Sequence, residues 1–292
     1  MLHSIRREGV EVSKVVQVIY HYPCLDGFTA AWAAYRYFKD KADYIPGIYG
    51  NEEIPDVKGK TVYLVDFSYP EDILRKIAKQ AYRVIVLDHH VTAEKNLKKL
   101  VDERLVEANF DMSRSGAVMT WEYLHPTKDV PEFVKYVSDR DLWKFELPNS
   151  KEVNAALFSR PYSFDEWDKL YDMSIEELIT EGKVLMRRFN KDIAEIKENT
   201  RRMTIQGYDV PTVNANHMFG SDLGSQLSVG EPFAAYYWVN KDGEFVFGLR
   251  SQPNTVDVSK IAELFGGGGH KTASGFRVKD LNTFQEIRSS KK

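Results

Sequence analysis

The sequence has little that points to export, to membranes or to long nucleic acids. Its 292 residues contain a single cysteine, Cys24, so no disulfide can form within the chain. No run reaches the roughly 18 apolar residues that a membrane-spanning helix needs. No apolar stretch typical of a signal peptide follows Arg6 and Arg7 near the N-terminus. These absences predict a protein of the reducing cytoplasm that does not contact a membrane.

An excess of positive charge is also missing. Lys and Arg total 40 against 43 Asp and Glu, which gives a net charge of −3. Proteins that coat long duplex nucleic acid usually present a strongly basic surface, so this balance argues against such a partner. A short anionic substrate that is gripped locally remains compatible with it. Apolar residues are plentiful at 43% of the chain, enough for the cores of two ordinary domains.

The order of apolar segments predicts an α/β fold. Short β-branched runs predict strands at residues 15–20, 61–65 and 83–87. Helical periodicity predicts helices at residues 27–38, from Pro70 onward, and at 116–124 and 131–137. Strands that alternate with helices form parallel β-α-β units, so we expect an open, doubly wound, mainly parallel sheet.

The pattern changes after Ser174, where many charges accompany apolar residues at helical spacing and predict a long linker helix. Beyond it we expect strands at 208–214, 233–239 and 245–250 and a short helix at 258–265. The expected organisation is a metal-binding catalytic domain over 1–180, a linker helix over 181–204 and a smaller, substrate-binding α/β domain over 205–292.

Ionisable side chains follow three of the predicted strands at the point where each strand ends. They are His21 with the nearby Asp26, then Asp66, then Asp88, His89 and His90. The carboxyl ends of parallel strands share one edge of a sheet, where ligands bind, so we expect these groups in one cleft. A further pair, Asp139 and Asp141, follows the helix predicted at 131–137 and would complete the set of ionisable groups around the cleft.

Carboxylates gathered in one cleft repel one another unless cations lie between them. Asp oxygens and His nitrogens suit Mn²⁺ or Mg²⁺, with Co²⁺ or Zn²⁺ as alternatives. Two ions about 3.5–4 Å apart, bridged by a carboxylate and a water, would clamp a phosphoryl group and activate that water. A single Asp after a strand is more often a helix N-cap, but the joint occurrence at successive strand ends favours a metal site. Cys24 stays open between a weak ligand, a residue that supports the ligands and a small buried hydrophobe, the last two being preferred.

Four consecutive glycines, 266–269, form the second informative pattern. Such a run costs backbone entropy on folding, of order 0.5–1 kcal/mol for each glycine relative to Ala. Without Cβ atoms it lets backbone N–H groups approach an anion closely, and the following His270 offers a ring N–H to the same phosphate. The predicted phosphate-binding residues are Gly267, Gly268, Gly269 and His270. The alternative is a flexible loop, and neither a P-loop nor a dinucleotide fingerprint is present.

Three residues are weaker candidates for substrate binding. Arg250 ends a predicted strand and either forks onto a phosphate or forms a surface ion pair. Arg114 and Ser115 directly precede the helix predicted at 116–124. They either cap that helix or contact substrate at its N-terminus, and the sequence does not decide between these roles.

The LDHH motif at Leu87–His90, Asp66, the HYPCLDG segment at 21–27 and the GGGGH motif at 266–270 together resemble the DHH phosphoesterase superfamily. GGGGH is typical of the DHH-associated C-terminal domain of that family. The resemblance implies a doubly wound domain, a linker helix and a smaller α/β domain, with the active site between the domains. It also implies dependence on metal ions, typically two Mn²⁺.

The same resemblance implies roles for individual residues. The positions that match metal ligands are His21, Asp26, Asp66, His89 and Asp139, with Asp66 as the bridge between ions. Asp88 would support the site, and His90 would be a ligand or support one. The substrate side is matched by Arg250, Gly268, Gly269 and His270. Cys24 departs from the family pattern, since many members have Asp there, and this puts one metal position in doubt.

The favoured function is hydrolysis of a phosphodiester in a short RNA or DNA oligonucleotide or in a linear or cyclic dinucleotide. An alternative is a phosphomonoesterase acting on a nucleoside bisphosphate such as 3′-phosphoadenosine 5′-phosphate, which would use the same metals. A third hypothesis, a nucleotide-binding protein without catalysis, is supported only by Cys24. The sequence leaves open whether the substrate is RNA or DNA and whether the chain forms a homodimer.

Overall fold

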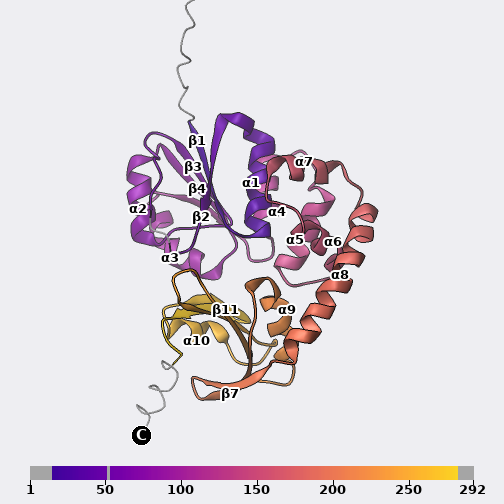
Figure 1. Cartoon of the computed structure of the whole chain (residues 1–292). Helices are drawn as coiled ribbons and strands as arrows, with labels where there is room; N and C mark the ends of the chain where they lie inside the picture. Colours follow the sequence, from indigo (N-terminus) through magenta and orange to yellow (C-terminus); the bar gives the residue numbers. More distant parts are fainter. Residues whose placement is uncertain (1–14, 51–52, 282–292) are drawn as a thin grey trace, which may run out of the picture. The chain divides into compact units, whose positions relative to one another are not determined.

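The computed structural model describes residues 15–50 and 53–281. These residues form two compact units, one made mainly of residues up to Ile179 and the other mainly of residues from Thr180 onward (Figure 1). Arg6 and Arg7 lie outside the described residues. No helix in the described part of the chain is long and apolar enough to cross a membrane.

The first unit is built on a parallel sheet of five strands in the order β2-β1-β3-β4-β5. The strands are β1 (Val16–His21), β2 (Ala42–Gly47), β3 (Thr61–Val65), β4 (Arg83–Asp88) and β5 (Glu107–Phe110). This confirms the expected parallel, doubly wound sheet. The strand order reverses between β1 and β3, the position at which open α/β sheets bind ligands beyond the carboxyl ends of their strands.

Helices cover both faces of this sheet (Figure 1). On one face α2 (Glu71–Gln80) and α3 (Val91–Asp102) bury an apolar stripe, represented by Ile77 and Leu97, against strand residues such as Leu64. On the other face lie α1 (Leu25–Phe38) and α4 (Gly116–Leu124), where Trp32 stacks on Trp121 with ring centroids 5.6 Å apart. Two-sided burial explains why the strands read as continuous apolar runs rather than as alternating ones.

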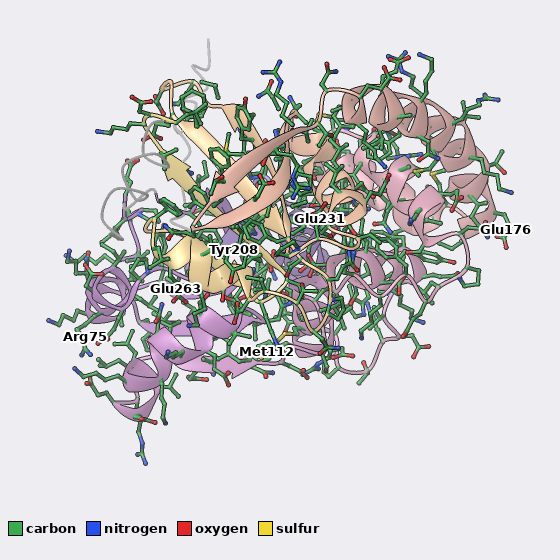
Figure 2. The ribbon with its side chains drawn as sticks, turned by 90° about the horizontal axis from the view of Figure 1, so that it is seen from below. Arg75, Met112, Glu176, Tyr208, Glu231 and Glu263 are labelled. Carbon is green, nitrogen blue, oxygen red and sulfur yellow. The ribbon has the colours of Figure 1, made fainter. Side chains whose placement is uncertain are left out.

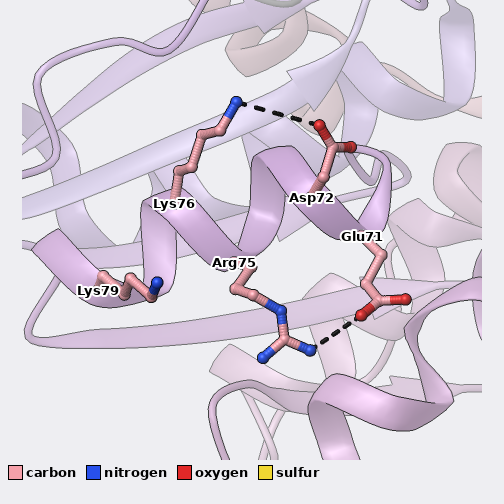
Figure 3. A pocket seen from close by; sticks show the side chains of 5 residues that line it. All are labelled: Glu71, Asp72, Arg75, Lys76 and Lys79. Atoms are coloured by element: carbon pink, nitrogen blue, oxygen red, sulfur yellow. Dashed lines mark hydrogen bonds and ion pairs between the residues drawn. The ribbon is translucent and has the colours of Figure 1, made fainter.

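The outer surface of α2 carries charges that pair with one another. Arg75 lies 2.8 Å from Glu71 and Lys76 lies 4.0 Å from Asp72, around a shallow hollow that Lys79 also lines (Figure 3). Arg75 projects from the rim of the unit in a second view (Figure 2). Exposed pairs of this kind contribute little to stability, so a substitution that removes one of them should leave the fold intact.

A short 3-10 turn, η1 (Lys39–Lys41), follows α1. Four further helices complete the first unit, and the last of them leads out of it. They are α5 (Glu132–Asp141), α6 (Ser150–Phe158), α7 (Phe164–Asp172) and α8 (Ile175–Lys197). The predicted end of the linker helix, at residue 204, is wrong, because α8 ends at Lys197 and residues 201–205 form a strand. The β-branched Thr204 and Ile205 pair with a neighbouring strand instead of continuing the helix.

The second unit contains a mixed sheet of six strands in the order β10-β11-β9-β8-β7-β6. Its strands are β6 (Arg201–Ile205), β7 (Tyr208–Asn214), β8 (Ala234–Val239), β9 (Phe245–Arg250), β10 (Gly268–His270) and β11 (Ala273–Val278). Only the β7–β8 pair is parallel among its neighbouring strands. The helices are α9 (His217–Leu227) and α10 (Val258–Glu263).

The second unit has its own apolar core, in which the rings of Phe247 and Phe276 stack 5.1 Å apart. The edge strand β6 carries polar contacts, since its Arg202 donates a hydrogen bond of 2.6 Å to Glu231, a residue labelled in Figure 2. Tyr208, labelled in the same view, begins β7. A separate core and sheet give this unit the small α/β architecture expected from the sequence.

Candidate metal centre

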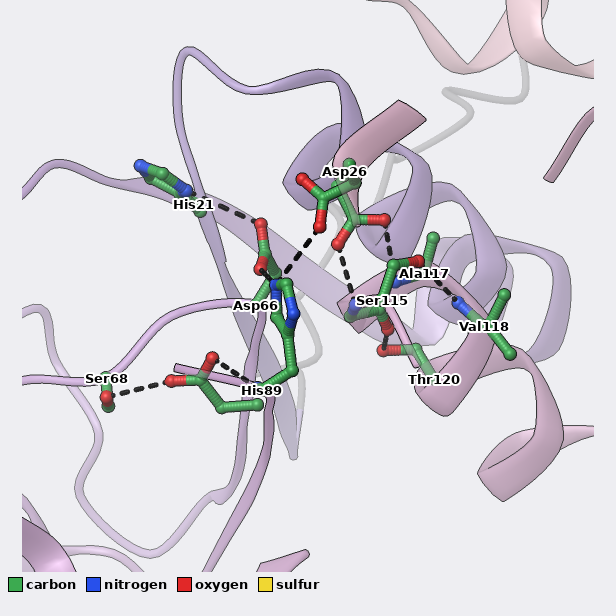
Figure 4. A network of polar contacts seen from close by, with 12 residues as sticks. His21, Asp26, Asp66, Ser68, His89, Ser115, Ala117, Val118 and Thr120 are labelled. Carbon is green, nitrogen blue, oxygen red and sulfur yellow. Dashed lines mark hydrogen bonds and ion pairs between the residues drawn. The ribbon is translucent and has the colours of Figure 1, made fainter. Parts of the chain in front are cut away.

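His and Asp side chains gather beyond the carboxyl ends of β1, β3 and β4 (Figure 4), and Cys24 lies near two of them. Among the described residues, three groups have potential ligand atoms within 4.8 Å of one another. The groups are His21, Cys24 and Asp66; Asp26, His89 and Asp141; and Asp66, His89 and His90. Asp66 and His89 each belong to two groups, so the groups form one continuous cluster.

Two glycines let the helices approach this cluster closely. A Cβ on Gly27 would lie 2.2 Å from the carbonyl oxygen of His21, so the first turn of α1 packs directly on the end of β1. A Cβ on Gly116 would lie 2.4 Å from the Cβ of Asp66 and 3.0 Å from a carboxylate oxygen of Asp26. Only glycine allows these approaches, which place Asp26 beside Asp66.

Asp66 lies at the centre of the cluster and is 1% exposed. It follows β3 with a positive φ of 53°, a conformation that Asp adopts more readily than most residues. The Nδ1 atom of His21 lies 3.4 Å from one of its carboxylate oxygens, and the Nε2 atom of His89 lies 3.1 Å from the other. Each oxygen of Asp66 therefore faces a different imidazole.

Asp26 is equally buried and binds the first turn of α4 (Figure 4). Its carboxylate accepts hydrogen bonds from the backbone N–H groups of Gly116 at 2.7 Å and Ala117 at 3.2 Å. Burial and the negative charges of Asp141 and Asp66 raise the pKa of Asp26 well above its ordinary value. A cation in the cluster would relieve this unfavourable crowding of carboxylates.

His89 connects the carboxylates. Its Nε2 atom lies 3.1 Å from Asp66 and 3.4 Å from Asp141. Burial opposes the charged imidazole, but the hydrogen bond to Asp66 and the charges of Asp141, Asp66 and Asp26 outweigh it and raise the pKa of His89 to about 10. The carboxylates around His89 thus favour a positive charge at this position, which a divalent cation would also supply.

Asp88 supports His89 and does not belong to the three donor groups. It is fully buried, and its carboxylate accepts hydrogen bonds from the hydroxyl of Ser68 at 3.0 Å and from the backbone N–H of His89 at 2.7 Å. The side chain of Asp88 therefore fixes the backbone that carries His89. This contact fits the supporting role considered for it rather than direct contact with a reacting group.

Asp139, one of the expected metal ligands, makes other contacts in the structure. Its carboxylate accepts hydrogen bonds from the backbone N–H groups of Glu146 at 2.9 Å and Leu147 at 3.3 Å and is absent from the donor groups. Asp141 joins Asp26 and His89 instead. The helix expected to stop at Val137 continues to Asp141, and residues two apart on a helix point about 200° away from each other, so only one of the two acids faces the cluster.

The structure assigns structural contacts to Arg114 and Ser115. Ser115 is the N-cap of α4 and accepts a hydrogen bond from the N–H of Val118 at 3.5 Å. Arg114 pairs with Asp111 at 2.7 Å and also with Glu122. Hydrogen bonds from the hydroxyl and backbone N–H of Ser113, together with Arg114, lower the pKa of Asp111 to about 2. Because Asp26 already binds the first amides of α4, capping is the role that these contacts support.

Most of the glycines at 266–269 have local structural roles in the second unit. The N–H groups of Gly266 and Gly267 bond to the carbonyl oxygens of Glu263 and Ala262 and close the end of α10, with Gly266 at a φ of +74°. This is the Schellman pattern of helix termination. These two amides therefore stabilise a helix end instead of standing free for an anion.

The run continues as strand β10, paired with β11, and not as a flexible loop. A Cβ on Gly267 would lie 2.1 Å from the carbonyl oxygen of Gly275, and one on Gly269 would lie 2.6 Å from that of Ala273. A Cβ on Gly268 would meet no atom within 4 Å. Gly266 also has open space around it, but its positive φ favours glycine, so Gly268 is the member of the run that neither packing nor a positive φ explains.

Arg250 and His270 occupy the same level of the second sheet. Both pair with Ala273 of β11, Arg250 from β9 and His270 from β10. The guanidinium of Arg250 donates to the carbonyl of Leu249 and to the hydroxyl of Ser221, each at 2.8 Å. Strands lie about 4.7–4.9 Å apart, so the two residues stand roughly 10 Å apart across a small alanine.

Sequence reasoning missed Ser68 and Tyr49. The ring of Tyr49 packs edge-on against His21 with centroids 4.9 Å apart. Tyr49 follows β2 just as His21, Asp66 and His89 follow or end their strands. The position of Tyr49 just after a strand could therefore have identified it. That required predicting β2, whose sequence ADYIPG lacks a continuous apolar run.

Comparison with known proteins identifies the class to which this site belongs. The sequence model of the DHH family N-terminal domain matches residues 15–147. Uncharacterized protein R106 of Acanthamoeba polyphaga mimivirus is 32% identical over 302 residues, which cover 92% of this chain and 70% of that protein. The chain therefore belongs to the DHH family and is a phosphoesterase, a hydrolase of phosphoric ester bonds.

One further protein sequence and one solved structure are also similar to this chain. Oligoribonuclease NrnB of Bacillus subtilis (strain 168) is 26% identical over 233 residues, which cover 72% of this chain and 56% of that protein. The crystal structure of an exopolyphosphatase-related protein from Bacteroides fragilis matches with a TM-score of 0.51 at 15% identity, covering 96% of this chain and 92% of that one. The second match shows a shared fold.

The donor set of the first unit fits the metal dependence of this family. Asp26 and Asp66 are buried carboxylates within reach of imidazoles, and carboxylate oxygen with imidazole nitrogen is a common ligand set for divalent ions. Buried charges of one sign are stable only when they are paired or bind metal. The cluster is therefore the part of the first unit best suited to hold ions.

Proposed function

We propose that this phosphoesterase hydrolyses phosphodiester bonds in short oligonucleotides or in linear or cyclic dinucleotides, with two divalent ions, of which Mn²⁺ is the first to test. The observation that carries this proposal is the continuous donor cluster in which Asp66 and His89 are each shared by two groups. The similarity to a Bacillus protein named an oligoribonuclease supports the substrate class. The cytoplasmic location and a homodimer stay predictions.

Divalent ions, when bound, would supply Lewis acidity toward a phosphoryl oxygen and lower the pKa of a water nucleophile. In this proposal Asp66 would help to hold both ions, together with His21 for one of them and with Asp26, His89 and Asp141 for the other. Asp88 holds His89 in place through the backbone N–H. The chain thus contributes a fixed set of donors, which reduces the rearrangement needed when substrate binds.

We propose that Arg250 and His270 hold a phosphate of the substrate in the second unit. They lie level with each other on β9 and β10, with the small side chain of Ala273 between them. Ser221 and the ring of Tyr236, whose centroid is 5.5 Å from the guanidinium carbon, orient Arg250. A pre-positioned guanidinium loses little side-chain freedom when it binds a phosphate.

The substrate class is tested with a panel run in Mn²⁺. Di- to pentanucleotides of RNA and DNA, linear and cyclic dinucleotides, and an adenosine bisphosphate are compared by kcat/KM. We expect the diesters to be cleaved to mononucleotides at least about tenfold more efficiently than the bisphosphate is dephosphorylated, a difference of about 1.4 kcal/mol in transition-state binding. A preference for the bisphosphate would instead identify a phosphomonoesterase, and inertness toward the whole panel would remove the proposal.

Two alanine variants separate the packing role of the glycines from a role in binding. Gly267→Ala places a Cβ 2.1 Å from a backbone oxygen, so we expect a loss of about 1–3 kcal/mol of stability in thermal unfolding. Gly268→Ala meets no neighbour, so stability should change by less than about 0.5–1 kcal/mol. If the open space at Gly268 receives substrate, KM should still rise by roughly tenfold. An unchanged KM in a folded Gly268→Ala protein would place the substrate elsewhere.

A further inference from the structure

The donor group at the end of β1 differs in chemistry from the remainder of the cluster. His21, Cys24 and Asp66 offer one nitrogen, one sulfur and one carboxylate oxygen within 4.8 Å of one another. Asp26, His89 and Asp141 offer two carboxylate oxygens and one nitrogen. Hard oxygen-rich sets favour Mg²⁺ and Mn²⁺, whereas a thiolate favours softer ions such as Zn²⁺.

We propose that Cys24 is a metal ligand and that the group His21, Cys24 and Asp66 selects Zn²⁺ or a similar thiolate-binding ion, so that the centre holds two different metals. The inference deepens the proposed function, because it assigns an ion class to one side of the same cluster. Three protein ligands are the number that zinc sites with an open coordination position use.

The local sequence and backbone favour this role for the sulfur. His21 and Cys24 are separated by two residues, a spacing common between paired zinc ligands. Cys24 is the N-cap of α1, with φ −144° and ψ 138°, and its Sγ atom lies within 4.8 Å of ligand atoms of His21 and Asp66. The close approach of Gly27 to His21 holds that helix end against β1.

Binding requires no further reactant. When the ion binds, the Sγ–H bond breaks, its proton passes to solvent, and a sulfur lone pair forms the bond to the ion. No electron is transferred. A bound divalent ion is sufficient to deprotonate a coordinating thiol.

The test uses the full chain, stripped of metal and titrated with Co²⁺ in a buffer free of thiols. Cobalt replaces zinc in such sites and gives an intense near-ultraviolet charge-transfer band when a thiolate binds it. Because Cys24 is the only cysteine of the chain, such a band has only one source. We expect the band to grow to one equivalent of Co²⁺ in the unaltered protein and to be absent in Cys24→Ser and Cys24→Asp.

A competition measurement completes the test. We expect Cys24→Asp to shift the ratio of Mn²⁺ to Zn²⁺ affinity at least about tenfold toward Mn²⁺, measured by metal analysis of the equilibrated protein. Failure of the unaltered protein to give the band while it binds Co²⁺ would overturn the inference, and this result needs no folded variant. Neither readout uses substrate, so the inference can fail while the phosphodiesterase proposal stands, and the reverse.

Discussion

Replacement of Asp66 by asparagine is expected to lower kcat/KM for phosphodiester cleavage by about a thousandfold or more. The two oxygens of Asp66 face the two imidazoles of His21 and His89, so a neutral amide would leave both imidazoles without an anionic partner. It would also replace one oxygen of the donor common to two groups by an NH2 group, which cannot bind a cation. A thousandfold loss corresponds to about 4 kcal/mol, within the several kcal/mol that metal ions contribute to such transition states.

Asparagine is the informative substitution because it tests charge without changing shape. Like aspartate, it tolerates the positive φ of 53° at this position. The metal-free variant should therefore stay folded, with a circular dichroism spectrum like that of the unaltered protein. Added Mn²⁺ should raise the melting temperature of the unaltered protein, since ligands that bind only the folded state stabilise it. We expect a much smaller rise in Asp66→Asn.

The matched control is Asp72→Asn on the outer surface of α2. Asp72 forms an exposed ion pair with Lys76 at 4.0 Å, the kind of contact that contributes little (Figure 3). Its replacement should leave both activity and the response to Mn²⁺ unchanged. Comparable activity in the Asp66→Asn and Asp72→Asn proteins would show that Asp66 does not hold the ions.

The sequence was sufficient to predict the strands that carry the site because these strands are buried on both faces. Thr61–Val65 and the apolar part of Arg83–Asp88 are continuous apolar runs, and the residues that follow them stand out as polar. The edge strands β2 and β5 were not predicted. Both border the sheet and are largely half-exposed, so little selection for a buried pattern marks them in the sequence.

The ligand set was harder to predict than the strands, since it depends on where a helix ends and which way it faces. Placing the end of α5 before Asp139 made Asp139 and Asp141 equivalent loop residues, although in the structure they project in different directions from one helix. The glycine run shows a similar limit. Its Schellman cap and tight pairing with β11 depend on the folded structure, and they account for glycines that the sequence alone connected with phosphate binding or with a flexible loop.

The two acids at the end of α5 have roles that substitution should separate. Asp139 is 6% exposed and its carboxylate receives two backbone N–H groups from the turn after the helix. Its function is to hold residues 146 and 147 against the helix end. Asp141 has a more exposed side chain, and its carboxylate points to His89, 3.4 Å away. Removing its charge therefore changes the cluster of donors itself.

We therefore expect Asp141→Asn to lower kcat/KM by about a hundredfold or more, a loss of about 2.7 kcal/mol, with a change in stability below about 1 kcal/mol. Asp139→Asn should do the opposite. Its amide nitrogen cannot accept one of the two backbone hydrogen bonds, which costs about 1–3 kcal/mol of stability, while kcat/KM measured well below the melting temperature stays within about threefold of the unaltered value. Thermal unfolding and steady-state kinetics on both proteins decide the matter. If Asp139→Asn instead lost activity without loss of stability, the ion would be held by Asp139, and α5 would have to turn its last residues toward the cluster when metal binds.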